Sequence, residues 1–193
     1  MHAAFILLGY LFGSIPFGLL LTKAAGLGDI RAIGSGNIGA TNVLRTGHKG
    51  LAAGTVLLDG AKGVAPVLIA GGLAGPEAAL WAGGGAVLGH SFPVWLGFRG
   101  GKSVATGLGV LLAVDWRVGI IACAAWLAVA VIFRRSSVAS LASFAAAPIA
   151  AWGFGYPGAV HLSLGIGVLI YLRHHANIRR LFAGTEPKIG KKG

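Results

Sequence analysis

The chain has 193 residues, of which 55% are hydrophobic and only 11% are charged. Soluble domains carry about 25% charged residues, so the composition excludes an ordinary water-soluble fold and predicts a membrane protein. The formal net charge of +11 favours anionic partners, and because the basic residues lie in short loops without interleaved aromatic residues, we expect lipid head groups or phosphorylated substrates rather than nucleic acid.

Seven apolar runs follow one another along the chain. They cover residues 3–22, 51–74, 78–92, 104–114, 118–133, 138–152 and 158–172. A spanning helix needs about 20 apolar residues and roughly 17 at the least, so several runs are short and the runs alone predict five to seven spans. We expect an all-α polytopic membrane protein with about seven transmembrane helices, some short or broken. Residues 1–193 would form one integral-membrane domain with a short basic tail at 187–193.

The basic residues predict the orientation of these helices. With seven spans, all of the 16 Lys and Arg residues except Lys62 and Arg117 fall on one side. The positive-inside rule makes that side cytoplasmic, with the N-terminus outside and the C-terminus inside. The first run has no preceding basic residue and no following cleavage site, so we expect it to remain as a span. Cys123 is the one cysteine, which excludes an internal disulfide.

The first polar segment contains GSGNIGATNVLR at 34–45. Gly34, Gly36 and Gly39 have the spacing of a dinucleotide-binding fingerprint, and Asp59 follows about twenty residues later, where such a fold places an acid. The glycines nevertheless follow a membrane span rather than a buried strand, and the acid lies inside the next apolar run. We therefore reject a nucleotide site.

Anion-binding chemistry remains in this segment. Its candidate residues are Ser35, Gly36, Asn37, Thr41, Asn42 and Arg45. The glycines let backbone N–H groups converge, and the arginine offers a bidentate fork for phosphate. The alternative is a flexible loop whose glycines only make turns.

A second polar segment, GFRGGKS at 97–103, has the composition of a P-loop. Its first glycine is one residue too close to the Gly-Lys-Ser triplet and no strand precedes it, so we do not expect nucleotide hydrolysis. A helix that begins here would still point N–H groups at an anion. The candidates are His90, Gly100, Gly101, Lys102 and Ser103. The alternatives are basic residues that snorkel beside a helix cap and a structural histidine.

The third polar segment, LRHHANIRRL at 172–181, follows the last apolar run. If it is helical, His174, Asn177 and Leu181 share one face. The alternative is an ordinary basic interfacial helix. We expect no metal at His174 and His175, because neighbouring helical side chains diverge and no carboxylate accompanies them.

Polar residues also occur inside the apolar runs. Asp59 and Lys62, three residues apart, are expected to pair beside a polar cavity. Ser137, Ser140 and Ser143 are more typical of helix packing than of nucleophiles.

Taken together, the ordered motifs resemble the bacterial acyl-phosphate:glycerol-3-phosphate acyltransferases, the PlsY family. The matching stretches are GSIPFG at 13–18, IGSGNIGATNVLR at 33–45, LDGAKG at 58–63, GHSFPVWLGFRGGKSVATGLG at 89–109 and RHHANIRRLFAGTE at 173–186. The resemblance implies a seven-span fold in the bacterial cytoplasmic (inner) membrane, with the active site facing the cytoplasm. It also implies transfer of a fatty acyl group from acyl phosphate to the sn-1 hydroxyl of glycerol 3-phosphate, giving 1-acylglycerol 3-phosphate and phosphate.

The resemblance carries over to single positions. The implied catalytic residues are Ser35, Arg45, His174 and Asn177. The implied substrate-binding residues are Gly36, Asn37, Thr41, Asn42, His90, Gly100, Gly101, Lys102 and Ser103, and Glu186 closes the third motif. We expect no metal or nucleotide cofactor, contact with membrane lipids, and functional coupling to an enzyme that produces acyl phosphate.

None of the six histidines is followed five positions later by Asp, and no Gly-x-Ser-x-Gly elbow occurs. We therefore expect direct attack by the glycerol hydroxyl, with the substrate phosphate rather than His174 accepting the proton. An acyl-enzyme on Ser35 is the mechanistic alternative. A transporter for a phosphorylated metabolite and a noncatalytic lipid-binding scaffold are the functional alternatives.

Overall fold

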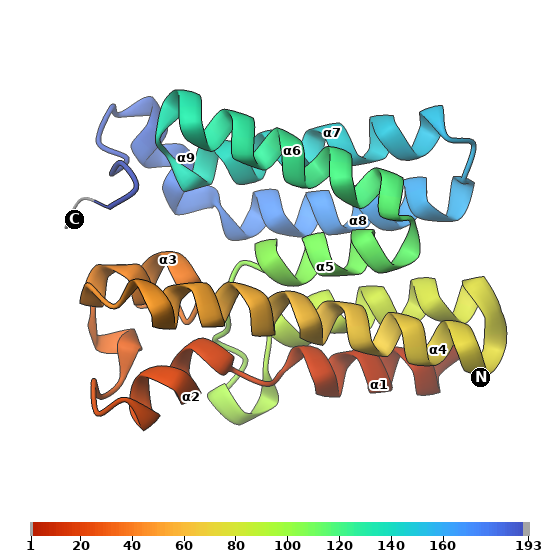
Figure 1. Cartoon of the computed structure of the whole chain (residues 1–193), viewed down its shortest axis with the longest axis horizontal. Coiled ribbons are helices and arrows are strands. Elements are labelled where there is room, and N and C mark those ends of the chain that lie inside the picture. The colour runs from red at the N-terminus through yellow and green to blue at the C-terminus, as the bar shows by residue number, and fades with distance from the viewer. Residues whose placement is uncertain (1, 191–193) are drawn as a thin grey trace.

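The structure, a computed structural model, describes residues 2–190, and every regular element in that range is a helix (Figure 1). The α-helices are α1 (His2–Gly13), α2 (Phe17–Ala24), α3 (Ala40–Val43), α4 (Lys49–Ser91), α5 (Val104–Val114), α6 (Trp116–Phe133), α7 (Ser136–Gly153), α8 (Pro157–Arg173) and α9 (His175–Phe182). Three 3₁₀ turns, η1 (Ile30–Ala32), η2 (Leu44–Thr46) and η3 (Val94–Leu96), lie in the connections.

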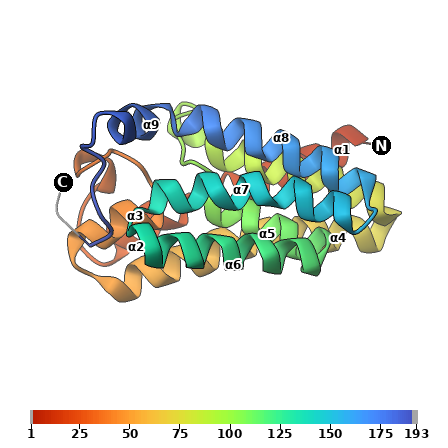
Figure 2. The ribbon, with the colours of Figure 1, turned by 90° about the horizontal axis from the view of Figure 1, so that it is seen from above.

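The predicted apolar runs all form helices, and four stretches are long and apolar enough to cross a membrane. These stretches are His2–Ala24, Lys49–Leu96, Trp116–Phe133 and Ser136–Gly153, whereas α5 and α8 are shorter apolar helices. Figures 1 and 2 show the long helices lying alongside one another, with the described ends of the chain at opposite ends of the bundle. Within residues 2–190, the prediction of an all-helical fold with short and broken helices is thus confirmed.

The longest element, α4, is two helices joined at a sharp kink. Ala74 has φ −145° and Gly75 has φ 83°, both outside the helical region, and Pro76 follows directly. A straight helix of 43 residues would be about 65 Å long, twice the thickness of a bilayer core. The kink instead folds α4 back on itself (Figure 1), in agreement with the separate runs predicted at 51–74 and 78–92.

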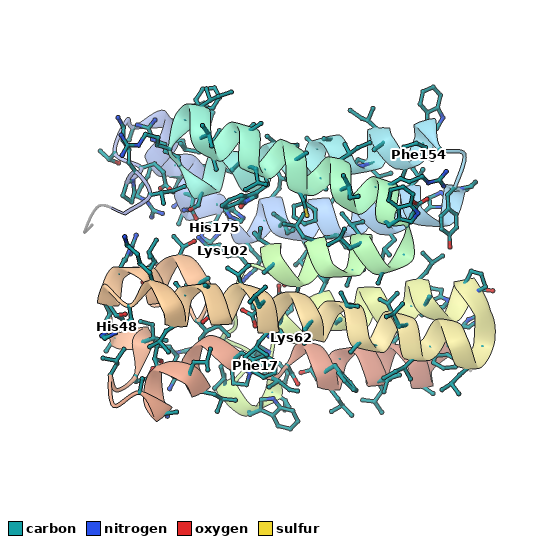
Figure 3. The ribbon with its side chains drawn as sticks, in the orientation of Figure 1. Phe17, His48, Lys62, Lys102, Phe154 and His175 are labelled. Atoms are coloured by element: carbon teal, nitrogen blue, oxygen red, sulfur yellow. The ribbon has the colours of Figure 1, made fainter. Side chains whose placement is uncertain are left out.

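The first apolar run is broken between α1 and α2, where Pro16 precedes the second helix. The break frees the carbonyl of Ile15, which accepts a hydrogen bond from Lys62 Nζ at 2.6 Å. Lys62 Nζ also lies 2.7 Å from Asp59 Oδ1 and 5.7 Å from the ring centroid of Phe17 (Figure 3). The predicted pairing of the two membrane-embedded charges is confirmed.

Small residues allow α1 to pack directly on the second half of α4. A Cβ added to Gly9 or Gly13 would overlap the backbone carbonyls of Ala82 and Ala86. Backbones approach this closely only where both surfaces lack bulky side chains. On the other side of the bundle, Ser143 Oγ donates to the Ala122 carbonyl at 2.7 Å, which fits the predicted packing role of that serine.

Candidate active site

A cavity of about 380 Å³ lies at the end of the bundle where α3, the loop before α5 and α9 meet. Figure 3 shows Lys102 between the corner formed by α3 and α4 and the corner formed by α8 and α9. The cavity brings together predicted residues from all three polar segments. Those that line it are Ser35, Asn37, Thr41, Asn42, Arg45, His90, Lys102, His174 and Asn177. Four other predicted residues, Gly36, Gly100, Gly101 and Ser103, are not among the lining residues.

Asn42 organises the loop that precedes α4. Its Nδ2 donates to the carbonyls of Ile30, Ile33 and Asn37 at 2.9 to 3.0 Å, and its Oδ1 accepts the N–H of Ser35 at 3.2 Å. Because the side chain is almost fully buried, these bonds replace the hydrogen bonds to water that the loop carbonyls lose. Asn42 lines the cavity, but its amide is committed to the loop.

Glycine geometry allows Arg45 to lie over the same loop. Gly34 has φ 55°, and a Cβ at this position would collide with the Arg45 guanidinium. Gly36, with φ 67°, uses its N–H to bond the Ile33 carbonyl at 3.0 Å. Between residues 2 and 190, no carboxylate pairs with Arg45. Its charge is therefore available to an anion in the cavity.

The Gly100–Gly101 pair is packed tightly against the end of α4. Its N–H groups donate to the carbonyls of Ser91 and His90 at 3.2 and 2.9 Å, and Arg173 donates to its two carbonyls at 3.0 and 3.1 Å. A Cβ on Gly101 would collide with the His90 ring. The glycines do permit close approach, as predicted, but to α4, so their N–H groups do not converge on the cavity.

Ser103 likewise acts inside the protein. Its Oγ donates to the Val87 carbonyl at 2.8 Å and lies 2.7 Å from Ser91 Oγ, and the residue is fully buried. Its φ of 58° makes the abrupt turn at which α5 begins. Of the loop at 97–103, Lys102, the residue before this turn, is the one that lines the cavity.

Lys102 is the first member of a hydrogen-bonded chain. Its Nζ donates to Asn177 Oδ1 at 2.5 Å, Asn177 Nδ2 donates to Glu186 Oε1 at 2.6 Å, and Arg180 Nε donates to Glu186 Oε2 at 2.7 Å. Burial lowers the pKa of Lys102 to about 8, against the opposing charge of Glu186. Burial raises the pKa of Glu186, but the hydrogen bonds from Asn177 and Arg180 outweigh it, so the net shift is downward. The lysine is therefore a cation at neutral pH and the glutamate an anion.

His174 occupies the break between α8 and α9, so the predicted continuous helical face is interrupted there. Its Nδ1 lies 2.8 Å from the Ile170 carbonyl, and because a carbonyl only accepts, Nδ1 carries the proton. Burial, reinforced by the charge of Lys102, lowers the pKa of His174 to about 4. The ring is therefore neutral at physiological pH, and its Nε2 has a free lone pair.

Asp59 and His90 lie in the cavity wall, with His90 Nδ1 3.7 Å from Asp59 Oδ1. Both side chains are buried, and Nδ1 of His90 has no hydrogen-bond partner within residues 2–190. The sequence indicated a polar cavity beside Asp59 but did not include this residue in the site. The available signal for Asp59 was its carboxylate, which stands inside the apolar run at 51–74.

Sequence reasoning missed other lining residues. Arg180 and Pro187, Lys188, Ile189 and Gly190 also line the cavity. We predicted a basic tail at 187–193, whereas residues 187–190 belong to the cavity wall and residues 191–193 lie outside the described residues. Nothing in the composition of this segment signals contact with the cavity. Across residues 2–190 there is no group of three or more His, Cys, Asp and Glu side chains that could hold a metal ion.

The fold and the site define a class, an integral-membrane helical protein with a cation-lined cavity at one end of its bundle. The model of the glycerol-3-phosphate acyltransferase family matches residues 3–184. The chain therefore belongs to the glycerol-3-phosphate acyltransferase family, and the resemblance found in the motifs is confirmed.

Individual relatives agree over nearly the whole chain. A glycerol-3-phosphate acyltransferase of Mesorhizobium japonicum is 61% identical over 188 residues, which cover 97% of this chain and 96% of that protein. The crystal structure of PlsY (YgiH), an integral membrane glycerol 3-phosphate acyltransferase, in its glycerol 3-phosphate form has a TM-score of 0.92 at 39% identity, covering 98% of this chain and 96% of that one. Its lysophosphatidic acid form has a TM-score of 0.90 at 38% identity, covering 97% and 94%.

Proposed function

We propose that this acyltransferase moves a fatty acyl group from acyl phosphate to the sn-1 hydroxyl of glycerol 3-phosphate, releasing 1-acylglycerol 3-phosphate and inorganic phosphate. The observation that carries the proposal is the convergence of Arg45, Lys102 and His174 on one cavity from three distant segments. Both substrates bear a phosphate, and the cavity offers the cations of Arg45 and Lys102 and the neutral imidazole of His174. Crystal forms of a structural relative with glycerol 3-phosphate and with lysophosphatidic acid support the acceptor and the product.

Phosphate binding falls to the cations of the cavity. Arg45 has no carboxylate partner in the described range, and Lys102 is hydrogen-bonded only to the neutral amide of Asn177. Arg180 is instead paired with Glu186. Arg45 can form two parallel hydrogen bonds with one phosphate, while Lys102 contributes a point charge.

The chemistry is direct transfer. The glycerol hydroxyl oxygen forms a bond to the acyl carbonyl carbon, the bond from that carbon to the phosphate oxygen breaks, and phosphate leaves with the electron pair. The hydroxyl proton passes to a phosphate oxygen, whose second pKa near 6 makes it a stronger base than His174, with its pKa of about 4. His174 would then orient the hydroxyl through Nε2. Holding the two substrates together supplies much of the acceleration.

An acyl-enzyme on Ser35 has less support. The Ser35 side chain is exposed in the loop, and within the described residues no base forms a hydrogen bond with its hydroxyl. A serine needs an adjacent base to become an effective nucleophile. Ser35 would instead hydrogen-bond a substrate phosphate.

The placement of charge and apolar surface supports the proposed membrane orientation. We propose seven spans with the N-terminus outside and the C-terminus in the cytoplasm of a bacterial inner membrane. The cavity lies at the basic end of the bundle and also has apolar lining from Val56, Leu108 and Trp126. Glycerol 3-phosphate would enter from water and the acyl chain from the lipid side, with acyl phosphate supplied by an enzyme at the same membrane.

The test is an assay of the purified protein in detergent with acyl phosphate and glycerol 3-phosphate. We expect lysophosphatidate and inorganic phosphate in equal amounts, and no product when an acyl thioester replaces acyl phosphate. Arg45→Gln should lower kcat/KM by about 100-fold through the loss of a charge-assisted bond, whereas Lys49→Gln, an exposed change nearby, should keep the activity. A transporter or a lipid-binding scaffold would release no phosphate.

The proton acceptor is tested separately with His174→Gln. An amide can still orient the hydroxyl, so we expect turnover within about tenfold of the unmodified protein at saturating substrate. A loss of about 1,000-fold would make His174 the general base instead.

A further inference from the structure

The chain does not end at α9 but returns across the cavity. Residues 185–190, which we call the C-terminal strap, follow Gly184, whose φ of 71° turns the chain back after the helix. Figure 2 shows this segment leaving α9 and crossing the end of the bundle past α6 and α7. The strap lies beyond residues 3–184, which the family model matches.

Backbone hydrogen bonds fix the strap at both ends. At α9 the N–H groups of Thr185 and Glu186 donate to the Arg180 carbonyl at 2.8 and 3.2 Å. At the turn between α6 and α7, the N–H of Ile189 donates to the Arg134 carbonyl at 2.7 Å. The strap therefore links α9, which supplies Asn177 and Arg180 to the Lys102 chain, to the α6–α7 turn, which supplies no side chain that hydrogen-bonds Lys102.

Arg135, which follows Arg134 in the α6–α7 turn, also bonds the strap. Its Nε donates to the backbone carbonyl of Glu186 at 3.1 Å, and its side chain is half-buried. The same Glu186 holds Asn177 through its carboxylate, and Asn177 holds Lys102. A continuous chain of hydrogen bonds thus leads from the α6–α7 turn to the lysine in the cavity.

We propose that the C-terminal strap is a fixed wall of the active site, and that Arg135 is a positioning residue that aims Lys102 into the cavity through Glu186 and Asn177. The inference rests on the proposed acyltransferase function of this cavity. Its physical basis is that Glu186 is 6% exposed and bonded on both carboxylate oxygens and on its carbonyl. Its position is therefore fixed only while all these partners are present.

The same chain gives a signature that a general loss of packing would not give. Among the charges that act on Lys102, Glu186 raises its pKa, whereas Arg180, Arg173 and Arg45 lower it. Burial is the largest cause of the lowered pKa of Lys102, so a loosened strap changes both the burial of the lysine and its distance from the Glu186 carboxylate. The pH at which the lysine loses its proton then differs from that in the unmodified protein.

The first experiment compares Arg135→Gln with Arg179→Gln in the acyl-transfer assay. Arg179 is exposed on α9 and its side chain makes no hydrogen bond within residues 2–190, so it controls for the loss of one positive charge. We expect Arg135→Gln to lower kcat/KM for glycerol 3-phosphate about tenfold or more, with the alkaline limb of its pH profile displaced from that of the unmodified protein. Arg179→Gln should stay within about twofold, with an unchanged profile.

A second pair of variants addresses the backbone of the strap. Ile189→Pro removes the N–H that bonds the Arg134 carbonyl, whereas Ile189→Ala removes side-chain atoms and keeps that bond. We expect the proline variant to lose about tenfold more activity than the alanine variant. Equal losses would mean that the strap backbone is not needed.

A third measurement does not depend on activity. Trypsin should cut slowly after Lys188 in the unmodified protein, because the strap is held, and at least about tenfold faster in Arg135→Gln. Mass spectrometry separates this product from cuts in residues 191–193. Equally fast cutting in both proteins, or unchanged activity in Arg135→Gln, would overturn the inference while leaving the acyltransferase proposal intact. If the unmodified protein has no acyl-transfer activity although its strap resists trypsin, the proposed function is overturned. The proposed role of the strap in the site is then overturned as well.

Discussion

Replacing Lys62 with methionine removes one of two opposite charges that the bundle buries side by side. Lys62 Nζ lies 2.7 Å from Asp59 Oδ1, the two side chains are 2% and 4% exposed, and the ammonium also bonds the Ile15 carbonyl. Methionine keeps the length of the side chain, so the change isolates the charge and its hydrogen bonds. It leaves Asp59 as a buried carboxylate without its ammonium partner, while the Ile15 carbonyl keeps its hydrogen bond from the Phe17 N–H.

Breaking a buried ion pair by removing one partner costs about 3–5 kcal/mol of unfolding free energy. For a chain of this size, each kcal/mol corresponds to roughly 2–4 °C in Tm, so we expect a decrease on the order of 10 °C. The double variant Asp59→Asn with Lys62→Met leaves no unpaired charge. It should therefore recover most of the loss, giving a coupling energy of at least about 2 kcal/mol.

The assay is thermal unfolding of the purified protein in detergent, followed by tryptophan fluorescence for the unmodified chain, both single variants and the double variant. Stability rather than activity is measured because Asp59 lines the cavity. If each single change costs less than about 1 kcal/mol, or if the double variant loses the sum of the two, then the pair does not stabilise the bundle and the reasoning is refuted.

Three further results are expected. Gly101→Ala should lower kcat/KM about tenfold or more, because its Cβ would collide with the His90 ring and displace the neighbouring lysine, whereas Gly72→Ala, where no atom lies within 4 Å, should have no effect. The value of kcat/KM should fall as pH rises through about 8, where Lys102 loses its charge, and a profile flat to pH 10 would contradict this assignment. Asn42→Ala should abolish most activity and speed proteolysis of residues 30–42, since four loop hydrogen bonds depend on this amide; intact protection would show that the loop holds without it.

The helices were predictable because the signal for each is local. Long apolar runs form helices in lipid, since every backbone polar group must be satisfied within the segment. The kink at Ala74 and Gly75 was visible as a gap between two runs, and the Asp59–Lys62 pair followed from a spacing of three residues. Nine of the thirteen candidate residues that the motifs named line the cavity.

The direction in which the glycine loop packs was not predictable. Gly100 and Gly101 have the composition of an anion-binding turn, yet their N–H groups bond carbonyls of Ser91 and His90. Whether such groups face a cavity or a neighbouring helix depends on how α4 and the loop dock. Nothing in seven residues of sequence contains that information.

The amino-acid sequence by itself indicated a membrane protein and the positions of its helices. It also indicated the basic end of the bundle and the family to which the chain belongs. These properties follow from composition, spacing and short ordered motifs, each readable within a few turns of helix. Only the tertiary structure decided that Lys102 meets Asn177, 75 residues away, and that Arg135 meets the backbone of Glu186, 51 residues away. Such contacts depend on the relative placement of whole helices, which is set by packing between distant segments. For the same reason, only the folded structure places the C-terminal strap at the cavity.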